Sequence, residues 1–360
     1  MTESIDLSAL RPQIDAAIET QLTRGAADLA PLQPEAADLL DVIGALLRGG
    51  KRLRPTFLYV GYRAGRMPHT PAAIALACAM EFLQTAALLH DDVIDGSDTR
   101  RGAPTAHRAL EARHCERGWE GDSARFGVAG AILAGNLCLG WADQAYDESG
   151  LPADQLARAR GCFDLMRAQL MAGQYLDVVE SVRPWSALDA AHRVAGAERM
   201  MTYKSAKYSI QHPLLIGADA AGVNASSRAA LAAYGLDLGL AFQLRDDVLG
   251  VFGDPSVTGK PAGDDLREGK RTVLLAHTLA GLGPADRAYA EAHLGRPDLD
   301  DAAIDRLREL ITASGAVAVV EADIASRAAR ARAALSGTDI DPAAAAALDD
   351  LVDLSTARSA

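Results

Sequence analysis

Apolar residues recur at helical spacing from Leu7 to about Leu47. Pro34 lies near the start of the second of two helices predicted there, and Gly49-Gly50 follows its end. No stretch of alternating apolar and polar residues is long enough to predict a strand. Turn signals divide the following part of the chain into further helical pieces, and they lie at Gly65–Pro71, Gly102–Pro104, Gly118–Ser123 and Gly150–Pro152. The pattern therefore predicts an all-α protein.

Two apolar stretches, Ala72–His90 and Val128–Ala142, approach the length of a membrane span. Glu81 and Gln84 interrupt the first, and the second is too short for a span and contains Asn136. We interpret both as helices buried in a large helical core, and we expect no transmembrane segment.

The composition is consistent with this interpretation. Of 360 residues, 49% are hydrophobic and 5% aromatic, and no low-complexity linker divides the chain, so we predict a single large helical domain over residues 1–360. A net charge of -12 argues against nonspecific binding to nucleic acid or anionic membrane. The N-terminus lacks the apolar segment of a signal peptide, and no two of the four cysteines form a CxxC pair. We expect a cytoplasmic protein with reduced thiols.

Carboxylates are concentrated after the first apolar stretch, at Asp91, Asp92 and Asp95. On a helix, Asp91 and Asp95 share a face. Three ionised carboxylates so close repel one another unless a cation lies among them, and Arg100 with Arg101 follows at once. A hard divalent ion that holds a phosphate or diphosphate fits both features. A solvated acidic helix end is the alternative.

A basic cluster precedes this region, at Gly49-Gly50-Lys51-Arg52-Leu53-Arg54-Pro55. Lys51 and Arg54 are three residues apart and could point the same way, which suits a diphosphate; a basic helix entry without a ligand is the alternative. Ala86 and Ala87 lie some 6–7.5 Å along the helix axis from Asp91, and Leu83 and Met80 lie deeper. These positions either leave room for a ligand's tail or allow close helix packing.

A second apolar helix also ends in carboxylates, Asp246 and Asp247, and two such ends could clamp several cations from opposite walls of one cavity. Before it, Lys204 and Ser205 lie side by side in a helix of small residues, where Lys204 could equally be a surface lysine. After it, the glycine-rich segment Gly253–Arg271 carries cations at intervals and could close over a charged ligand or be a solvated loop.

Four sequence blocks together resemble the all-trans polyprenyl diphosphate synthases, and in particular the bacterial geranylgeranyl diphosphate synthases. The blocks are GGKRLRP, EFLQTAALLHDDVIDGSDTRRGAPTAH, YKSAKYS and FQLRDDVLGVFGDPSVTGKPAGDDLREGKRT, within residues 49–272. The resemblance implies the isoprenoid synthase fold, with long helices around a deep central cavity, and a homodimer. It implies the condensation of isopentenyl diphosphate with an allylic diphosphate (dimethylallyl, geranyl or farnesyl), with Mg²⁺ as cofactor, three ions per site.

The resemblance also assigns site residues. Metal ligands would be Asp91, Asp92, Asp95, Asp246 and Asp247. The isopentenyl diphosphate site would comprise Lys51, Arg54, Gln84 and Arg101. Arg100, Lys204, Ser205, Gln243 and Lys260 would hold the allylic diphosphate. The catalytic set would be Asp91, Asp92, Asp95, Lys204 and Asp246, and the chain-length channel would be lined by Leu83, Ala86 and Ala87.

In this reaction the allylic C–O bond ionises, and divalent ions with basic side chains neutralise the departing diphosphate. The double bond of isopentenyl diphosphate then attacks the cation. The released diphosphate can take the proton, so we expect structural roles for His90 and His107.

Three positions depart from the family pattern: Gln84 replaces a frequent histidine, Gly250 a third aspartate and Asn136 a frequent aspartate. With Gln84 we expect altered rather than lost binding of isopentenyl diphosphate. With Gly250 we expect one ion held by Asp246 and waters.

For the product we predict geranylgeranyl diphosphate, because the Trp119–Phe126 region and the segment DDVLGVFGDPSVTGKPAGDDLREGKRT resemble bacterial short-chain enzymes that make it. Ala86 and Ala87 leave the upper channel open, which argues against a strict farnesyl producer. A longer product is the alternative, with Trp141 or Met80 as the floor of the channel. A class I terpene cyclase and a non-catalytic synthase subunit are more distant alternatives.

Overall fold

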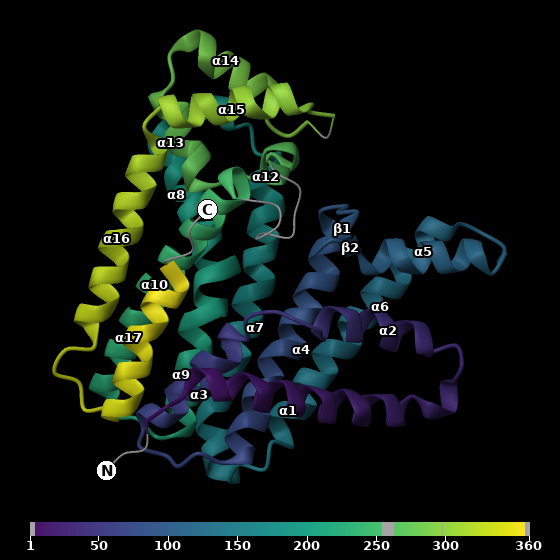
Figure 1. Ribbon diagram of the computed structural model, residues 1–360, viewed down its shortest axis with the longest axis vertical. Helices are drawn as coiled ribbons and strands as arrows, with labels where there is room; N and C mark the ends of the chain where they lie inside the picture. The colour runs from purple at the N-terminus through teal and green to yellow at the C-terminus, as the bar shows by residue number, and fades with distance from the viewer. Residues whose placement is uncertain (1–3, 254–262, 297, 357–360) are drawn as a thin grey trace. The chain divides into compact units, whose positions relative to one another are not determined.

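The computed structural model of the chain describes residues 4–253, 263–296 and 298–356 (Figure 1). Nearly all regular structure in these ranges is helical, which confirms the predicted all-α class. The chain divides into two compact units. The first comprises Met1–Arg160, Ile216–Val223 and Ile340–Ala347, and the second comprises Gly161–Leu215, Asn224–Asp339 and Leu348–Ala360.

The elements of the first unit come from the N-terminal part of the chain. They are α1 (Leu7–Asp28), the 3-10 turn η1 (Ala30–Leu32), α2 (Ala37–Leu47), α3 (Leu53–Ala64), α4 (Pro71–Ile94), β1 (Thr99–Arg100), β2 (Ala103–Pro104), α5 (Ala106–Glu116) and α6 (Ser123–Asp147). The two strands form a hairpin of two residues on each side, which is too short to give an alternating sequence pattern.

The second unit contains the following helices. They are the 3-10 turn η2 (Trp185–Ala187), α8 (Ala190–Met201), the π-helix η3 (Thr202–Gln211), α10 (Ala225–Phe252), α12 (Asp264–Glu268), α13 (Val273–Gly281), α14 (Pro284–His293), α15 (Asp301–Ala313) and α16 (Ala316–Ala334). Three helices contribute residues to both units, and they are α7 (Ala153–Val182), α9 (His212–Ala220) and α17 (Pro342–Thr356).

The core of the first unit is built on α4, which packs against α6 (Figure 1). The helix begins where the side chain of Thr70 accepts a hydrogen bond from the backbone N–H of Ala73, and Pro71 occupies its first turn. Small residues on α6 allow the close approach, because a Cβ added at Gly135 would collide with the imidazole of His90. The carboxylates at the end of α4 are therefore positioned by a closely packed, buried helix.

Two helices, α4 and α6, are long and apolar enough to cross a membrane by length and composition. Such a pair is weak evidence for membrane insertion, because core helices of globular proteins pass the same test. In α4, 72% of the apolar window is buried inside the protein, as the sequence predicted for a core helix. In α6 the share is 39%, and Ile132 and Leu133 are exposed.

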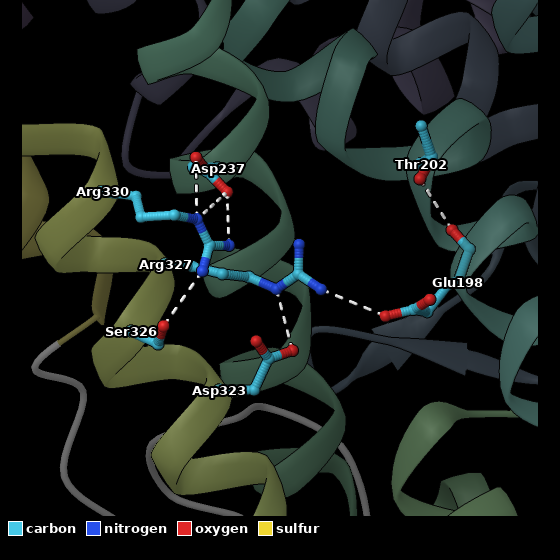
Figure 2. Close-up of polar contacts among 7 residues, drawn as sticks. All are labelled: Glu198, Thr202, Asp237, Asp323, Ser326, Arg327 and Arg330. Atoms are coloured by element: carbon cyan, nitrogen blue, oxygen red, sulfur yellow. Dashed lines mark hydrogen bonds and ion pairs between the residues drawn. The ribbon is translucent and has the colours of Figure 1, made fainter. Parts of the chain in front are cut away.

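The second unit has a separate apolar core formed by α10, α13, α15 and α16, with Leu244, Leu274 and Ile311 among its buried residues. Ion pairs reinforce the packing of α16 on its neighbours (Figure 2). Arg330 reaches Asp237 of α10 at 2.7 Å, and Arg327 reaches Glu198 of α8 at 3.1 Å. α8 leads directly into η3, so these contacts hold the base of the helix that carries Lys204.

Candidate active site

The first aspartate motif lies at the end of α4, as the sequence predicted. The backbone N–H of Asp95 caps the helix by donating to the carbonyl of Asp91 at 2.8 Å, which places the two residues one turn apart. Asp91 is half-buried, Asp95 is exposed and Asp92 is fully buried. Asp92 thus points away from the surface that carries Asp91 and Asp95.

The β1–β2 hairpin presents Arg100 and Arg101 beside this motif. Its two central residues, Arg101 and Gly102, have φ of 53° and 75°. Positive φ at both centres is typical of the type I′ turn, which suits a tight two-residue hairpin. The turn points the two arginines in different directions. Arg100 contacts the aspartates, and Arg101 donates to the carbonyl of Leu46 at 3.2 Å.

Arg100 forms an ion pair with Asp92. Its Nε and Nη2 lie 2.6 Å and 2.5 Å from Oδ1 of Asp92, and Nη2 lies 4.0 Å from Oδ2 of Asp91. Burial raises the pKa of Asp92, and the Arg100 guanidinium opposes that shift. Oδ2 of Asp92 is buried and receives no hydrogen bond from any described residue. This oxygen can still accept a donor or a cation.

The basic cluster lies at the start of α3, in the same unit. Lys51 is exposed and Arg54 is half-buried, while Arg52 is buried. Gln84 on α4 is half-buried too. Burial lowers the pKa of Arg101, and the charge of Glu81 opposes this shift. The unit therefore contains Lys51, Arg54, Arg101 and Gln84, the residues predicted to bind isopentenyl diphosphate.

In the second unit, η3 carries Lys204 and Ser205, both half-buried. π-helical turns are rare and occur frequently at functional sites. The backbone of Lys204 packs so closely on α7 that a Cβ added at Gly173 would lie 2.5 Å from its N atom. Nζ of Lys204 forms an ion pair with Oδ2 of Asp177 at 2.6 Å. Asp177 is a residue that sequence reasoning missed, because nothing in its spacing from Lys204 predicts the pairing.

The second aspartate motif lies near the end of α10. Asp246 is half-buried, and Asp247 is buried. Oδ1 of Asp247 accepts a hydrogen bond from Nε2 of Gln243 at 2.9 Å and lies 3.6 Å from Nζ of Lys270. Burial raises the pKa of Asp247 to about 6 against the opposing effect of Lys270. Gln243 thus supports a carboxylate of the motif, a contact that the sequence did not predict.

Lys270 and Asp265 were also missed. Nζ of Lys270 lies 3.7 Å from Oδ2 of Asp265, and the nearby carboxylates, Asp265 first among them, raise the pKa of Lys270. A Cβ added at Gly250 would collide with the Asp265 carboxylate. The glycine in place of a third aspartate therefore leaves room for a carboxylate from α12. Lys260, predicted to hold the allylic diphosphate, lies outside the described residues.

The chain is similar to known proteins over most of its length. The polyprenyl synthetase family matches residues 37–311. The chain belongs to this family. It is 32% identical over 292 residues to the geranylfarnesyl diphosphate synthase of Aeropyrum pernix, covering 80% of this chain and 83% of the relative. It is 33% identical over 287 residues to the farnesyl diphosphate synthase of Geobacillus stearothermophilus, covering 75% and 86%.

A solved structure extends the match over nearly the whole chain. The geranylgeranyl pyrophosphate synthase of Corynebacterium glutamicum, complexed with isoprenyl diphosphate and magnesium, has a TM-score of 0.92 at 38% identity, covering 99% of this chain and 100% of that one. The fold is therefore that of the isoprenoid synthases, and the predicted enzyme class, a trans-prenyltransferase, is confirmed.

The donor set suits the magnesium that the family implies. Within the described ranges, no three His, Cys, Asp or Glu side chains are grouped so as to hold an ion by themselves. Magnesium needs no such group, because it usually binds one or two carboxylates and completes its shell with waters and substrate phosphates. Asp91 and Asp95 offer such oxygens one helical turn apart, and Oδ2 of Asp92 is a buried oxygen without a donor.

The predicted channel residues lie on α4 with different burial: Leu83 and Ala86 are fully buried, and Ala87 is half-buried. Their role in chain length stays a prediction. The two histidines of this region have structural contacts. The His90 Nε2 lies 3.3 Å from the carbonyl of Ile132, and the His107 Nδ1 lies 3.2 Å from Oγ1 of Thr105.

Proposed function

We propose that the protein is a magnesium-dependent synthase that joins isopentenyl diphosphate to an allylic diphosphate and yields an all-trans polyprenyl diphosphate. The observation that carries the proposal is that two helices, α4 and α10, each carry aspartates at or near their C-terminal end, with a basic side chain on the buried carboxylate. The Corynebacterium glutamicum structure, with isoprenyl diphosphate and magnesium bound, supports the same ligands here.

Bound magnesium would neutralise the diphosphate as the allylic C–O bond breaks. We assign to it the carboxylates of the two aspartate motifs, Asp91, Asp92, Asp95, Asp246 and Asp247, with Oδ2 of Asp92 as a buried oxygen that no described residue donates to. Lys204, held by Asp177, and Arg100, held by Asp92, add fixed positive charge for the leaving group. Ser205, Gln243 and Lys260 complete the predicted allylic diphosphate set.

Lys51, Arg54, Arg101 and Gln84 would fix the diphosphate of isopentenyl diphosphate and so hold its double bond for attack. Gln84 can donate a hydrogen bond to phosphate through its amide. We assign no side chain as a base, since the two histidines near the motif are engaged with a carbonyl and a hydroxyl. The released diphosphate can accept the proton.

We infer geranylgeranyl diphosphate as the product, with three magnesium ions per site. The relatives include synthases of farnesyl and of geranylfarnesyl diphosphate, so a longer chain is the second candidate. We further propose that residues 1–360 act as one catalytic domain in the cytoplasm. A homodimer is supported by α6, which exposes Ile132 and Leu133 with 41% and 55% of their surface accessible.

One assay tests the proposal. Purified protein receives magnesium and isopentenyl diphosphate with dimethylallyl, geranyl or farnesyl diphosphate in turn, and products are identified by chain length. We expect elongated diphosphates and none when magnesium is removed with a chelator. Release of a cyclic hydrocarbon would instead indicate a terpene cyclase, and no turnover with any primer would indicate a non-catalytic subunit.

A further inference from the structure

The side chain of Arg52, within the basic cluster, donates hydrogen bonds to residues of three helices. Its Nε donates to Oδ1 of Asp15 on α1 at 2.7 Å, and its Nη1 donates to Oε2 of Glu81 on α4 at 2.5 Å. Its Nη2 donates to the carbonyl of Leu47, the last residue of α2, at 2.6 Å. Charge-assisted bonds from a planar guanidinium fix direction as well as distance. The position of Arg52 is thus set by α1, α2 and α4 at once.

The backbone of Arg52 needs such support. It has φ of 55° and ψ of 32°, the left-handed conformation that side chains other than glycine rarely adopt, and it follows Gly49 and Gly50 at φ of 89° and 91°. Its carbonyl then accepts hydrogen bonds from the N–H and the hydroxyl of Thr56, in the first turn of α3. A left-handed residue whose side chain is anchored makes the turn rigid.

Glu81 also acts on Arg101. Burial lowers the pKa of the Arg101 guanidinium, and the negative charge of Glu81 opposes this shift. Arg52 and Arg101 both lie close to Gly50. A Cβ added at Gly50 would lie 3.5 Å from Nη2 of Arg101 and 3.7 Å from Nη1 of Arg52. They also donate to successive carbonyls at the end of α2, those of Leu46 and Leu47. The Glu81 carboxylate, with a side chain 10% exposed, balances this concentration of positive charge.

We propose that Glu81 and Arg52 are positioning residues for the diphosphate of isopentenyl diphosphate, a role that rests on the function proposed above for Lys51, Arg54 and Arg101. Arg52 is 5% exposed and its guanidinium is engaged by three protein acceptors, so its charge serves the protein rather than the ligand. The anchored turn sets where Lys51 and Arg54, its neighbours in sequence, leave the backbone.

The test compares Michaelis constants of Glu81→Gln for the two substrates. We expect the KM for isopentenyl diphosphate to rise about tenfold, since a neutral amide weakens a charge-assisted bond, while the KM for the allylic substrate changes by less than about twofold. If Glu81 acted only through its charge, Glu81→Gln should lower the KM for isopentenyl diphosphate, because removal of a negative charge should strengthen anion binding. An unchanged or lowered KM for isopentenyl diphosphate would overturn the proposal.

Asp38→Asn is the matched control. Asp38 is another buried carboxylate of the same unit, paired with Arg113 at 2.7 Å and with Arg117, away from the basic cluster. We expect it to lower the melting temperature as Glu81→Gln does, with both KM values unchanged. If the control also raised the KM for isopentenyl diphosphate, the effect would be one of general stability and the proposal would fail.

Two further variants keep the test decisive. If Glu81→Gln does not fold, Asp15→Asn removes the half-exposed partner of Arg52 and should raise the same KM by about two- to threefold; no rise would contradict the proposal. Lys51→Ala tests the underlying site itself. If Lys51→Ala leaves the KM for isopentenyl diphosphate unchanged, the proposed function of the cluster is wrong, independently of Glu81.

Discussion

The two aspartate motifs each bury one carboxylate, and they balance its charge in different ways. In the first, Arg100 comes from a hairpin five residues after the motif, binds Asp92 with two nitrogens at 2.5 Å and 2.6 Å, and lies 4.0 Å from Asp91. In the second, Lys270 comes from beyond α12 and lies between Asp247 and Asp265, 3.6 Å and 3.7 Å away. An arginine close in sequence thus neutralises one buried aspartate, and a lysine distant in sequence lies between two buried aspartates.

The aspartates of each motif also differ in how accessible they are to a ligand. A buried aspartate with a basic partner is neutralised by the protein itself. Asp91 is half-buried, Asp95 is exposed and Asp246 is half-buried, so all three are more accessible to a ligand than Asp92 and Asp247. We therefore propose that the more accessible aspartates, Asp91, Asp95 and Asp246, contribute most to magnesium binding.

The largest expected effect follows from Asp91. We predict that Asp91→Ala lowers kcat by about a thousandfold or more, because it removes a ligand of the ion that neutralises the leaving group. Steady-state kinetics at saturating magnesium measure this, with circular dichroism as the control for folding. A folded variant with near-normal turnover would show that Asp91 is not a metal ligand.

Substitution of the two cations tests the comparison directly. Lys270→Gln should lower the free energy of unfolding by about 3–5 kcal/mol, since it leaves two buried carboxylates without their cation. Arg100→Gln leaves one buried carboxylate without its cation and should lower the free energy of unfolding by less. Urea unfolding without magnesium compares them. Equal losses, or a larger loss for Arg100→Gln, would contradict the view that the lysine is shared.

Acid should weaken the second unit through His212. Burial lowers the pKa of this histidine to about 4, with Lys207 and Arg228 acting in the same direction, and its ring lies 3.0 Å from Gln169 and 3.6 Å from Cys162. The unfolded state binds the proton more readily than the folded state, so stability falls as pH drops from about 6.5 to about 4.

The expected loss is roughly 3 kcal/mol over that pH range. About 2 kcal/mol of this loss falls between pH 7 and pH 5, where urea unfolding of wild type and His212→Asn measures it. The stability of the variant relative to wild type should improve as the pH is lowered. A difference between the two proteins that stays constant with pH would show that His212 does not titrate in this range.

The smallest expected effect concerns product length. Ala86→Phe should shorten the product by one isoprene unit, and we expect a modest loss of stability as well, because Ala86 is fully buried. Product analysis by reversed-phase chromatography, with Leu76→Met as a volume-conserving control deeper in α4, would test it. An unchanged product from a folded Ala86→Phe protein would show that the tail runs elsewhere.

Sequence reasoning recovered the parts of this structure that depend on local pattern. The helix that ends in Asp91–Asp95, the second that carries Asp246 and Asp247, and the all-α class all follow from periodicity and turn residues. The short hairpin that directs Arg100 was not predicted, because two-residue strands leave no alternation to detect.

Contacts between distant residues were beyond the sequence. Asp177 lies 27 positions from Lys204, and no spacing rule relates two side chains on separate helices. The same holds for Glu81 and Arg52, 29 positions apart. Gly250 looked like a lost ligand in the sequence, whereas the structure shows the Asp265 carboxylate in the space that a side chain there would need.

The central claim of the proposed function is that the aspartates of each motif bind magnesium together with a diphosphate. Isothermal titration of the wild-type protein with inorganic diphosphate tests it most directly, with and without magnesium, and beside Asp91→Ala and Asp246→Ala. We predict binding that requires magnesium and is lost in both variants. Binding that persists in the presence of a chelator, or in both variants, would contradict the claim.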